Sequence, residues 1–432
     1  MIASQTISRD SKNLSLWQEQ APPPSGLGDD PLPKLADVAI VGGGYTGLGA
    51  ALWLSRFGAK AVVLERYQLT YGASSRNGGK ALVGLKRDAS VLVKKFGPVR
   101  GRALWQASLD GIAAVEQMVT EERIACDFKR YGSLFAAAKS SHYEKMCRET
   151  EWLKKNLGYE RFNISKSELR KEIGTDAYHG GVVDELSAGL HPAKYAVGLA
   201  VAARRAGASL SAMTDVQVIH SSHGMFTITT SRGTLVAKEV LIATNGYTGS
   251  LVPYIQRRVV PVGSYIIATE PLSAGVQNEI SPRGRMFYDS KWYLNYFRLT
   301  PDGRMLFGGR TTISTDQDLT VSARILREAM VKIFPMLRGT LVTHSWTGHL
   351  GVTFDGLPHI GRFERIHYAL GYSGHGVALS IYLAREVAEL MAGKRKSSIF
   401  LEIGHPTNFF YHGQPWFRPL MGKVLKVLDW VS

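Results

Sequence analysis

The chain has 432 residues, of which 45% are hydrophobic, and its 52 Lys and Arg against 36 Asp and Glu give a net charge of +16. Because a single hydrophobic core stops growing at roughly 250–300 residues, this length predicts two domains. The two cysteines, Cys126 and Cys147, form no CxxC and no His/Cys cluster, which argues against structural disulfides and zinc and favours a reducing compartment. No apolar run reaches the ~18–20 residues that span a bilayer, so we expect a cytoplasmic protein.

The positive charge does not identify a partner by itself. The basic residues are spread along the chain, with no arginine-rich tract and no recognisable binding module, so we expect no nucleic-acid partner. A positive field would serve equally to attract anionic substrates or an anionic membrane surface.

The N-terminal part combines an arm with a dinucleotide-binding pattern. Residues 1–35 lack a signal-peptide pattern and predict a mostly extended arm. Strand-like residues then enter Gly42-x-Gly44-x-x-Gly47, which opens a helix, and a second strand ends in Glu65. The glycines permit a tight turn, close approach of a pyrophosphate and close helix packing, and the acid is placed for a ribose diol. The complete order predicts a dinucleotide site.

The later elements suggest a cofactor domain that the chain leaves and re-enters. In chain order the patterns predict a helix over 48–57, helical and charge-rich residues 85–185, and a helix over 195–205. Strands follow at 216–219, 226–230, 235–236 and 240–244, then a hairpin of 293–300 and 304–309, and finally a helix over 377–391. The strand that begins at residue 240 ends in a glycine turn at Gly246.

The first βαβ unit does not separate NAD from FAD, but three features favour FAD. The fingerprint lies near the N-terminus, and no second one exists for a nicotinamide. The strand ending at Gly246 comes where a two-segment FAD domain returns to its cofactor. Gly371-Tyr-Ser-Gly374-His-Gly376 opens a helix whose positive end could face the flavin pyrimidine and stabilise its anionic reduced form.

The expected fold is α/β, with a Rossmann-like FAD-binding domain of the glutathione-reductase type interleaved with an α+β substrate-binding domain built on an antiparallel sheet. The expected division is an arm (1–35), an FAD-binding domain (36–84, 191–254 and 341–395), a substrate-binding domain (85–190 and 255–340) and a C-terminal tail (396–432).

The motifs resemble the FAD-dependent D-amino-acid-oxidase-like (DAO) superfamily, and within it the branch of γ-glutamylputrescine oxidoreductases and related bacterial amine oxidoreductases. The resemblance spans nearly the whole chain and is carried by residues 42–47, 71–79, 296–310, 346–361 and 371–376.

The resemblance implies roles for particular residues. The loop of residues 74–79 should wrap the ribityl chain and flavin edge, Val216 should meet the adenine through its backbone, and residues 374–378 should contact the flavin O2 region. Neither cysteine falls in a matching segment, so we expect non-covalent FAD. The expected FAD-binding residues are Gly42, Gly44, Tyr45, Thr46, Gly47, Glu65, Arg66, Ser74, Ser75, Arg76, Asn77, Gly78, Gly79, Val216, Thr244, Asn245, Gly246, Gly348, Gly374, His375, Gly376, Val377 and Ala378.

The implied reaction oxidises the C–N bond of a small primary or secondary amine. Hydride passes from the carbon next to a neutral amine to flavin N5, and water hydrolyses the imine to a carbonyl. Positioning and desolvation matter more here than a dedicated base. γ-Glutamylputrescine is the preferred substrate. An imino-acid or D-amino-acid dehydrogenase that passes electrons to quinone, or a flavin subunit of a larger complex, is the alternative.

Six residues are candidates for the substrate pocket: Arg310, Tyr293, Tyr296, Trp346, His349 and His375. Arg310 could bind a substrate carboxylate bidentately or form a surface salt bridge. Tyr293 and Tyr296 should point to opposite faces of one strand, so at most one readily lines the pocket. His375, at a helix N-terminus, should shape the flavin site rather than act as a base. Trp346 could equally belong to the core.

The electron acceptor is expected to be O₂, a quinone or a carrier protein, because no nicotinamide domain is visible. Sarcosine-oxidase relatives use a lysine over the flavin to help reduce O₂, and residues 304–310 contain none, which puts oxidase activity in doubt. The tail predicts a basic amphipathic helix that packs on the body or lies on an anionic membrane at the inner face. Its residues are Leu420, Val424, Val427, Leu428 and Val431, with Lys423, Lys426, Trp416 and Trp430.

Overall fold

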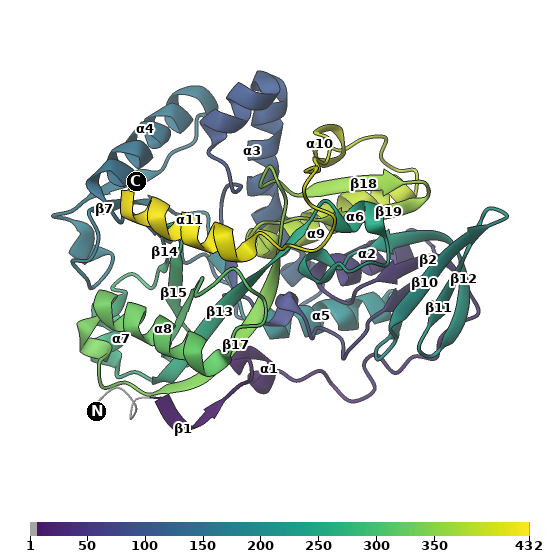
Figure 1. The fold of residues 1–432 in the computed structure, drawn as a ribbon, viewed down its shortest axis with the longest axis horizontal. Helices are drawn as coiled ribbons and strands as arrows, with labels where there is room; N and C mark the ends of the chain where they lie inside the picture. Colours follow the sequence, from purple (N-terminus) through teal and green to yellow (C-terminus); the bar gives the residue numbers. More distant parts are fainter. Residues whose placement is uncertain (1–6, 432) are drawn as a thin grey trace.

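The computed structural model describes residues 7–431, apart from the side chains of 8–10, 419, 423, 426, 428, 430 and 431. Its architecture is mixed α/β, as expected, with two large sheets that lie at the left and right of Figure 1. The right-hand sheet contains β2 (Leu35–Val41), β3 (Ala61–Leu64), β9 (Ser209–Ser211), β10 (Val216–Ser222), β11 (Met225–Thr230), β12 (Gly233–Ile242), β18 (His359–Phe363) and β19 (Ile366–Leu370).

This first sheet holds the dinucleotide-binding pattern. Its order among the described residues is β10-β11-β12-β2-β3-β9, and β19 also pairs in parallel with β12. The parallel strands β2 and β3 are almost wholly buried, because both of their faces are covered. One face packs on the helices α2 (Tyr45–Arg56), α5 (Pro192–Arg205) and α9 (Gly376–Met391), and the other on residues around α6 (Pro253–Gln256).

The second sheet is mostly antiparallel. Its strands, in spatial order, are β1 (Ile7–Lys12), β17 (Val342–Val352), β13 (Val260–Pro271), β16 (Arg304–Gly309), β15 (Asn295–Leu299), β14 (Met286–Asp289), β5 (Ser133–Ala136), β7 (Gly180–Asp184) and β6 (Phe162–Ser165). Phe297 and Phe307 lie opposite each other on β15 and β16, with ring centroids 5.4 Å apart. They form a core with α8 (Leu319–Ile333) and α7 (Ala274–Ile280).

Long helices complete the molecule. α3 (Ala89–Glu121) is interrupted at Gly97, which has a φ of +80° and is followed by Pro98. The next helix along the chain is α4 (Ser140–Leu157). The short strands β4 (Lys80–Ala81) and β8 (Ala188–Gly189) pair with each other. The remaining helices are α1 (Leu16–Gln20), α10 (Ile399–Glu402) and α11 (Arg418–Val431).

The structure differs from the sequence-based expectations in four places. The third segment of the cofactor domain does not begin at residue 341, because β17 pairs with β13 in the second sheet. Residues 85–185 are not purely helical, since they contribute β5, β6 and β7. The arm contains β1, which pairs with β17, and the helix α1, in which Leu16 and Trp17 are buried. Residues 235–242 belong to one continuous strand, β12.

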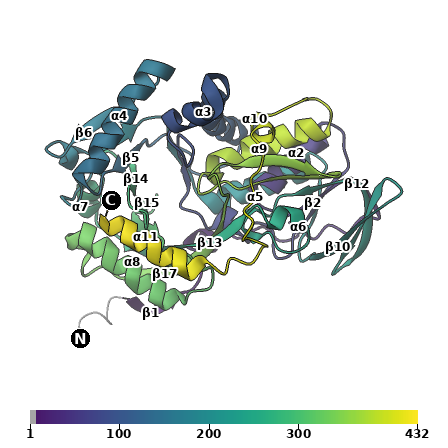
Figure 2. The ribbon, with the colours of Figure 1, turned by 45° about the horizontal axis from the view of Figure 1, so that its top comes forward.

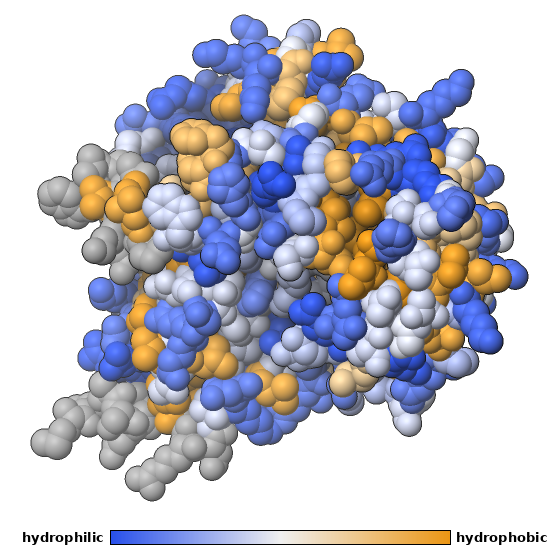
Figure 3. Space-filling view, turned by 45° about the vertical axis from the view of Figure 1, so that its right-hand side comes forward, coloured by the Kyte–Doolittle hydropathy of each residue, from blue (hydrophilic) through white to orange (hydrophobic). Residues whose placement is uncertain are grey.

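Within the described residues, no helix is long and apolar enough to cross a membrane. The face drawn in Figure 3 carries mainly hydrophilic side chains, with apolar side chains gathered in smaller patches between them.

Candidate active site

The turn between β2 and α2 is shaped by its glycines. Gly42 has a φ of +109°. A Cβ atom on Gly47 would lie 1.9 Å from the Gly42 carbonyl oxygen, so helix and strand approach as closely as the backbone allows. The Tyr45 N–H donates to Ser74 Oγ at 2.9 Å, and the N-cap residue, Gly44, has no side chain to accept the other N–H groups of the first turn of α2. Those other N–H groups are therefore available to an anion.

The expected ribose and adenine contacts lie together beside this turn. Glu65, at the end of β3, accepts the Gly43 N–H at 2.7 Å, and burial raises the pKa of its carboxyl. Arg66 Nε donates to Asp215 Oδ1 at 2.7 Å, which places both next to Val216 at the start of β10. Arg66, just after β3, and Asp215, just before β10, thus lie side by side.

The loop of residues 73–79 is anchored by side chains from distant segments. Its carbonyl groups accept hydrogen bonds from Trp17 Nε1 (2.9 Å, to Asn77), Trp346 Nε1 (2.8 Å, to Arg76) and Arg298 Nη1 (2.8 Å, to Gly79). These donors come from α1, β17 and β15, so the arm and the second sheet both fix the loop. The contribution of α1 was not expected from an extended arm.

The turn after β12 contacts β17, which in turn contacts the 73–79 loop. Asn245 Oδ1 accepts the Gly371 N–H at 3.0 Å and so ties Thr244–Gly246 to the segment that leads into α9. A Cβ atom on Gly348 of β17 would lie 3.6 Å from Arg76 Cβ. His349 stacks on Tyr247 with ring centroids 4.5 Å apart.

The start of α9 is also open. Gly374 has a φ of +106° with no atom near the position of an added Cβ, and Gly376 begins the helix without a side-chain cap. Val377 and Ala378 are buried in its first turn. Among the described residues, His375 Nδ1 and Arg76 Nε are buried polar atoms that lack a hydrogen-bond partner. Open helix ends, a glycine cradle and orphaned polar atoms fit an extended, anionic dinucleotide.

Cations gather at the end of β16. Arg310 donates Nη1 to the Trp292 carbonyl oxygen at 3.2 Å, and burial lowers the pKa of its guanidinium. Lys86 keeps part of its surface exposed to solvent, but the protein groups around it still desolvate its ammonium group. This desolvation, and secondly the charge of Arg310, lowers its pKa to about 8. In the part of the chain that the structure describes, no carboxylate forms an ion pair with either cation. The pair can bind an anionic group.

Two tyrosines and a histidine adjoin these cations. Burial raises the pKa values of Tyr293 and Tyr296, and the charge of Arg310 opposes this rise in both. Tyr293 precedes β15, so the expected alternation of Tyr293 and Tyr296 within one strand does not occur. Burial, and then the charge of Lys86, lowers the pKa of His375 to about 4, so this imidazole is neutral near pH 7.

The other two candidates lie elsewhere. Trp346 is 1% exposed and packs in a core cluster, with its N–H on the 73–79 loop, so it supports the site from behind. His349 lies beside Tyr247, and its pKa is influenced by Arg76 rather than by Arg310. The charge of Arg310 acts on Tyr293, Tyr296 and Lys86, and the charge of Lys86 acts on His375, so these side chains belong to one neighbourhood.

Sequence reasoning missed two lysines, Lys80 and Lys86. Lys80 Nζ lies 4.7 Å from the Tyr296 ring centroid and donates to the Phe287 carbonyl oxygen at 2.8 Å. Burial lowers the pKa of Lys80 well below its usual range. Both lysines follow the 73–79 loop closely in sequence, and this proximity is the signal that could have found them.

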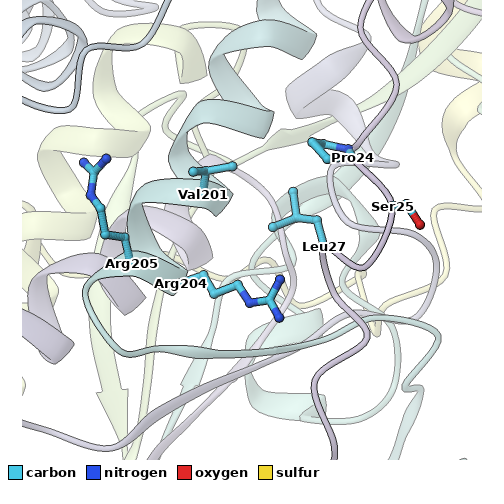
Figure 4. Close-up of a pocket in the computed structure, with 6 residues that line it drawn as sticks. All are labelled: Pro24, Ser25, Leu27, Val201, Arg204 and Arg205. Carbon is cyan, nitrogen blue, oxygen red and sulfur yellow. The ribbon is translucent and has the colours of Figure 1, made fainter.

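A separate recess of ≈ 340 Å³ lies between the arm and α5 (Figure 4). Its two arginines are paired, Arg204 with Asp30 at 2.9 Å and Arg205 with Glu122. The recess is lined by Pro24, Ser25, Leu27, Val201, Arg204 and Arg205, and shares no residue with the site above.

Known proteins resemble this chain over most of its length. Residues 37–390 match the DAO family model, described as FAD dependent oxidoreductase. The γ-glutamylputrescine oxidoreductase of Escherichia coli (strain K12) is 35% identical over 368 residues, covering 83% of this chain and 84% of its own. A probable oxidoreductase, OrdL, of Haemophilus influenzae is 34% identical over 372 residues, covering 84% of this chain and 85% of its own.

Solved structures share the fold. Glycine oxidase from Geobacillus kaustophilus superposes with a TM-score of 0.75 at 21% identity, over 87% of this chain and 99% of its own. L-proline dehydrogenase from P. horikoshii superposes with a TM-score of 0.71 at 22% identity, over 85% of this chain and 96% of its own. The family match, the relatives and the glycine cradle lead to one conclusion: the chain belongs to the DAO family and is an FAD-dependent oxidoreductase.

Proposed function

We propose that the enzyme oxidises the C–N bond of a small amine that carries a carboxylate, with γ-glutamylputrescine as the first candidate. The observation that carries this proposal is the pair of cations, Lys86 and Arg310, that have no ion-pair partner among the described residues and adjoin the start of α9. The name of the Escherichia coli relative supports the choice of amine. FAD, held without a covalent link, supplies the hydride-accepting chemistry when bound.

The side chains of the site suit the binding of such a substrate. The planar fork of Arg310 can donate two parallel hydrogen bonds to a carboxylate. Burial raises the pKa of Tyr296 to about 12, so its phenol stays neutral beside Arg310. Nearby cations disfavour the protonated form of an amine. Lys86 and Arg310 therefore favour the neutral amine that oxidation requires, without a dedicated base.

The proposal is tested by anaerobic absorbance of the purified, flavin-loaded protein. γ-Glutamylputrescine, putrescine, sarcosine, proline and D-alanine are added in turn, and the flavin band near ~450 nm is followed. We expect γ-glutamylputrescine to bleach it fastest. Bleaching by proline or D-alanine alone would replace the proposal with an imino-acid or D-amino-acid dehydrogenase. Admitting air to the reduced protein then tests O₂ as acceptor.

The charge of Lys86 predicts a pH dependence of anion binding. Its pKa is lowered from 10.5 to about 8, so it loses its charge as pH rises through 8, whereas Arg310 stays charged. The affinity for glutarate, a carboxylate without an amine, should fall about fivefold between pH ~7 and ~9.5 by calorimetry. Lys86→Met should bind more weakly at pH ~7 and remove the dependence, and Lys154→Met on α4 should leave it intact. A flat wild-type profile would contradict this assignment.

The electron acceptor that we propose is a quinone in an anionic membrane. The observation that favours it is an outward apolar stripe on α11, where Leu420, Val424 and Val427 are 63%, 43% and 57% exposed. The side chains of Lys423, Lys426, Leu428, Trp430 and Val431 lie outside the described residues. The protein should float with anionic vesicles in a density gradient, and asparagine at the three exposed positions should abolish flotation. If the wild-type protein stays at the bottom of the gradient, it does not bind the vesicles and the proposed membrane contact is wrong.

A further inference from the structure

Among the described residues of the C-terminal helix α11, four contact the body from one face. Arg418, Gly422, Leu425 and Asp429 fall on one face at helical spacing. Arg418 Nη1 donates to Thr315 Oγ1 at 3.3 Å, the Gly422 carbonyl oxygen accepts the Tyr293 hydroxyl at 3.3 Å, and Leu425 joins a core cluster. The exposed apolar stripe lies on the opposite face. Figures 1 and 2 show α11, drawn in yellow, running beside α8.

Asp429 makes the contact that reaches the candidate site. Its Oδ1 accepts the Trp292 N–H at 2.6 Å and its Oδ2 accepts the Tyr293 N–H at 2.9 Å. The carbonyl group of the same Trp292 accepts Arg310 Nη1 at 3.2 Å. The Asp429 carboxylate therefore binds the backbone of the Trp292–Tyr293 turn, and the carbonyl group of that turn binds the Arg310 guanidinium.

This arrangement leaves Arg310 available to a ligand. Asp429 forms no ion pair with Arg310 in the described structure, yet its negative charge opposes the effect of burial on the Arg310 pKa. The two oxygens of Asp429 are used by backbone N–H groups, and such charge-assisted bonds are strong and directional. A carboxylate placed directly on Arg310 would instead compete with an anionic substrate.

We propose that Asp429 is a positioning residue, which fixes the Trp292–Tyr293 turn so that Arg310 presents its free N–H groups to the substrate carboxylate. The proposal rests on the proposed function, because it assigns α11 to carboxylate recognition at that same site. It makes the C-terminal helix a part of the substrate site rather than a passive tail.

The test compares Asp429→Asn with wild type and with Glu402→Gln, a loss of one negative charge elsewhere in the tail. Hydrogen exchange of the segment 290–295 should become about tenfold faster in Asp429→Asn alone. The KM for γ-glutamylputrescine should rise about tenfold with kcat within about twofold, while both constants for putrescine, which lacks a carboxylate, stay unchanged. Glutarate affinity, followed by perturbation of the flavin spectrum, should fall about tenfold.

The outcomes separate this proposal from the proposed function. If exchange of the segment 290–295 is unchanged in Asp429→Asn, the positioning role is wrong whatever the substrate is. If the constants for both amines worsen together, Asp429 only stabilises the fold, and the proposal is also wrong. If neither amine is oxidised by wild type, faster exchange with weaker glutarate binding still supports the positioning role, and faster exchange with unchanged glutarate binding overturns it.

Discussion

Replacing Gly47 by alanine is expected to give a protein that is purified almost free of FAD. The added Cβ would lie 1.9 Å from the Gly42 carbonyl oxygen, a backbone atom that cannot rotate away. Overpacking costs about 1–3 kcal/mol even where neighbours can adjust. Here the strain is relieved by moving α2 away from β2, which displaces the N-terminal end that receives the pyrophosphate.

The measurement is the ratio of flavin to protein absorbance after purification, together with circular dichroism to show that the chain is folded. We expect less than about a tenth of the wild-type flavin content. The matched control is Gly275→Ala in the first turn of α7, where an added Cβ meets no atom within 4 Å. A folded Gly47→Ala protein with full flavin content would show that the turn between β2 and α2 does not hold the cofactor.

The second large effect is expected for Arg310→Met. Removal of a bidentate, charge-assisted pair with a buried carboxylate costs about 2–5 kcal/mol, so kcat/KM for γ-glutamylputrescine should fall by about 30-fold or more. Arg310→Lys keeps the charge but not the planar fork, so its kcat/KM should lie between those of the wild type and Arg310→Met. The constants for putrescine should change little, because it offers no carboxylate.

Steady-state kinetics on both amines check this prediction, with Arg304→Met as the control at the other end of β16. Arg304 donates Nε to Asp302 at 2.8 Å and Nη1 to the Thr269 carbonyl oxygen at 2.9 Å, at the opposite end of the strand from Arg310, so its loss should leave kcat/KM of the folded protein nearly unchanged. If Arg310→Met loses activity equally toward both amines, Arg310 acts on the flavin or the fold, and carboxylate recognition must be assigned elsewhere.

Local sequence determines the cofactor half of this molecule well. The strand, glycine turn, helix and acid of residues 37–65 are adjacent along the chain, and the family and cofactor that they predicted are confirmed. The hairpin of β15 and β16 was equally visible, because its turn residues carry their own conformational preferences. The helix α2 begins three residues earlier than its apolar pattern, at Tyr45, because Gly44 is its N-cap.

The parts that sequence reasoning missed depend on long-range pairing. Nothing local shows that β17 pairs with β13, or that β1 joins β17 across the chain. Lysines are usually exposed, so the only signal that Lys80 and Lys86 carried was their closeness in sequence to the 73–79 loop, until the fold placed them near Tyr296 and Arg310. Asp429 was hidden in the same way, because its partners lie far away in sequence.

The central claim is that an amine substrate is recognised through its carboxylate. The most direct measurement is the ratio of kcat/KM for γ-glutamylputrescine to kcat/KM for putrescine, determined on the wild-type, flavin-loaded enzyme. The cation pair of Lys86 and Arg310 predicts a ratio of about 100 or more. A ratio near one would contradict the account, because the two cations would then contribute nothing to the choice of substrate.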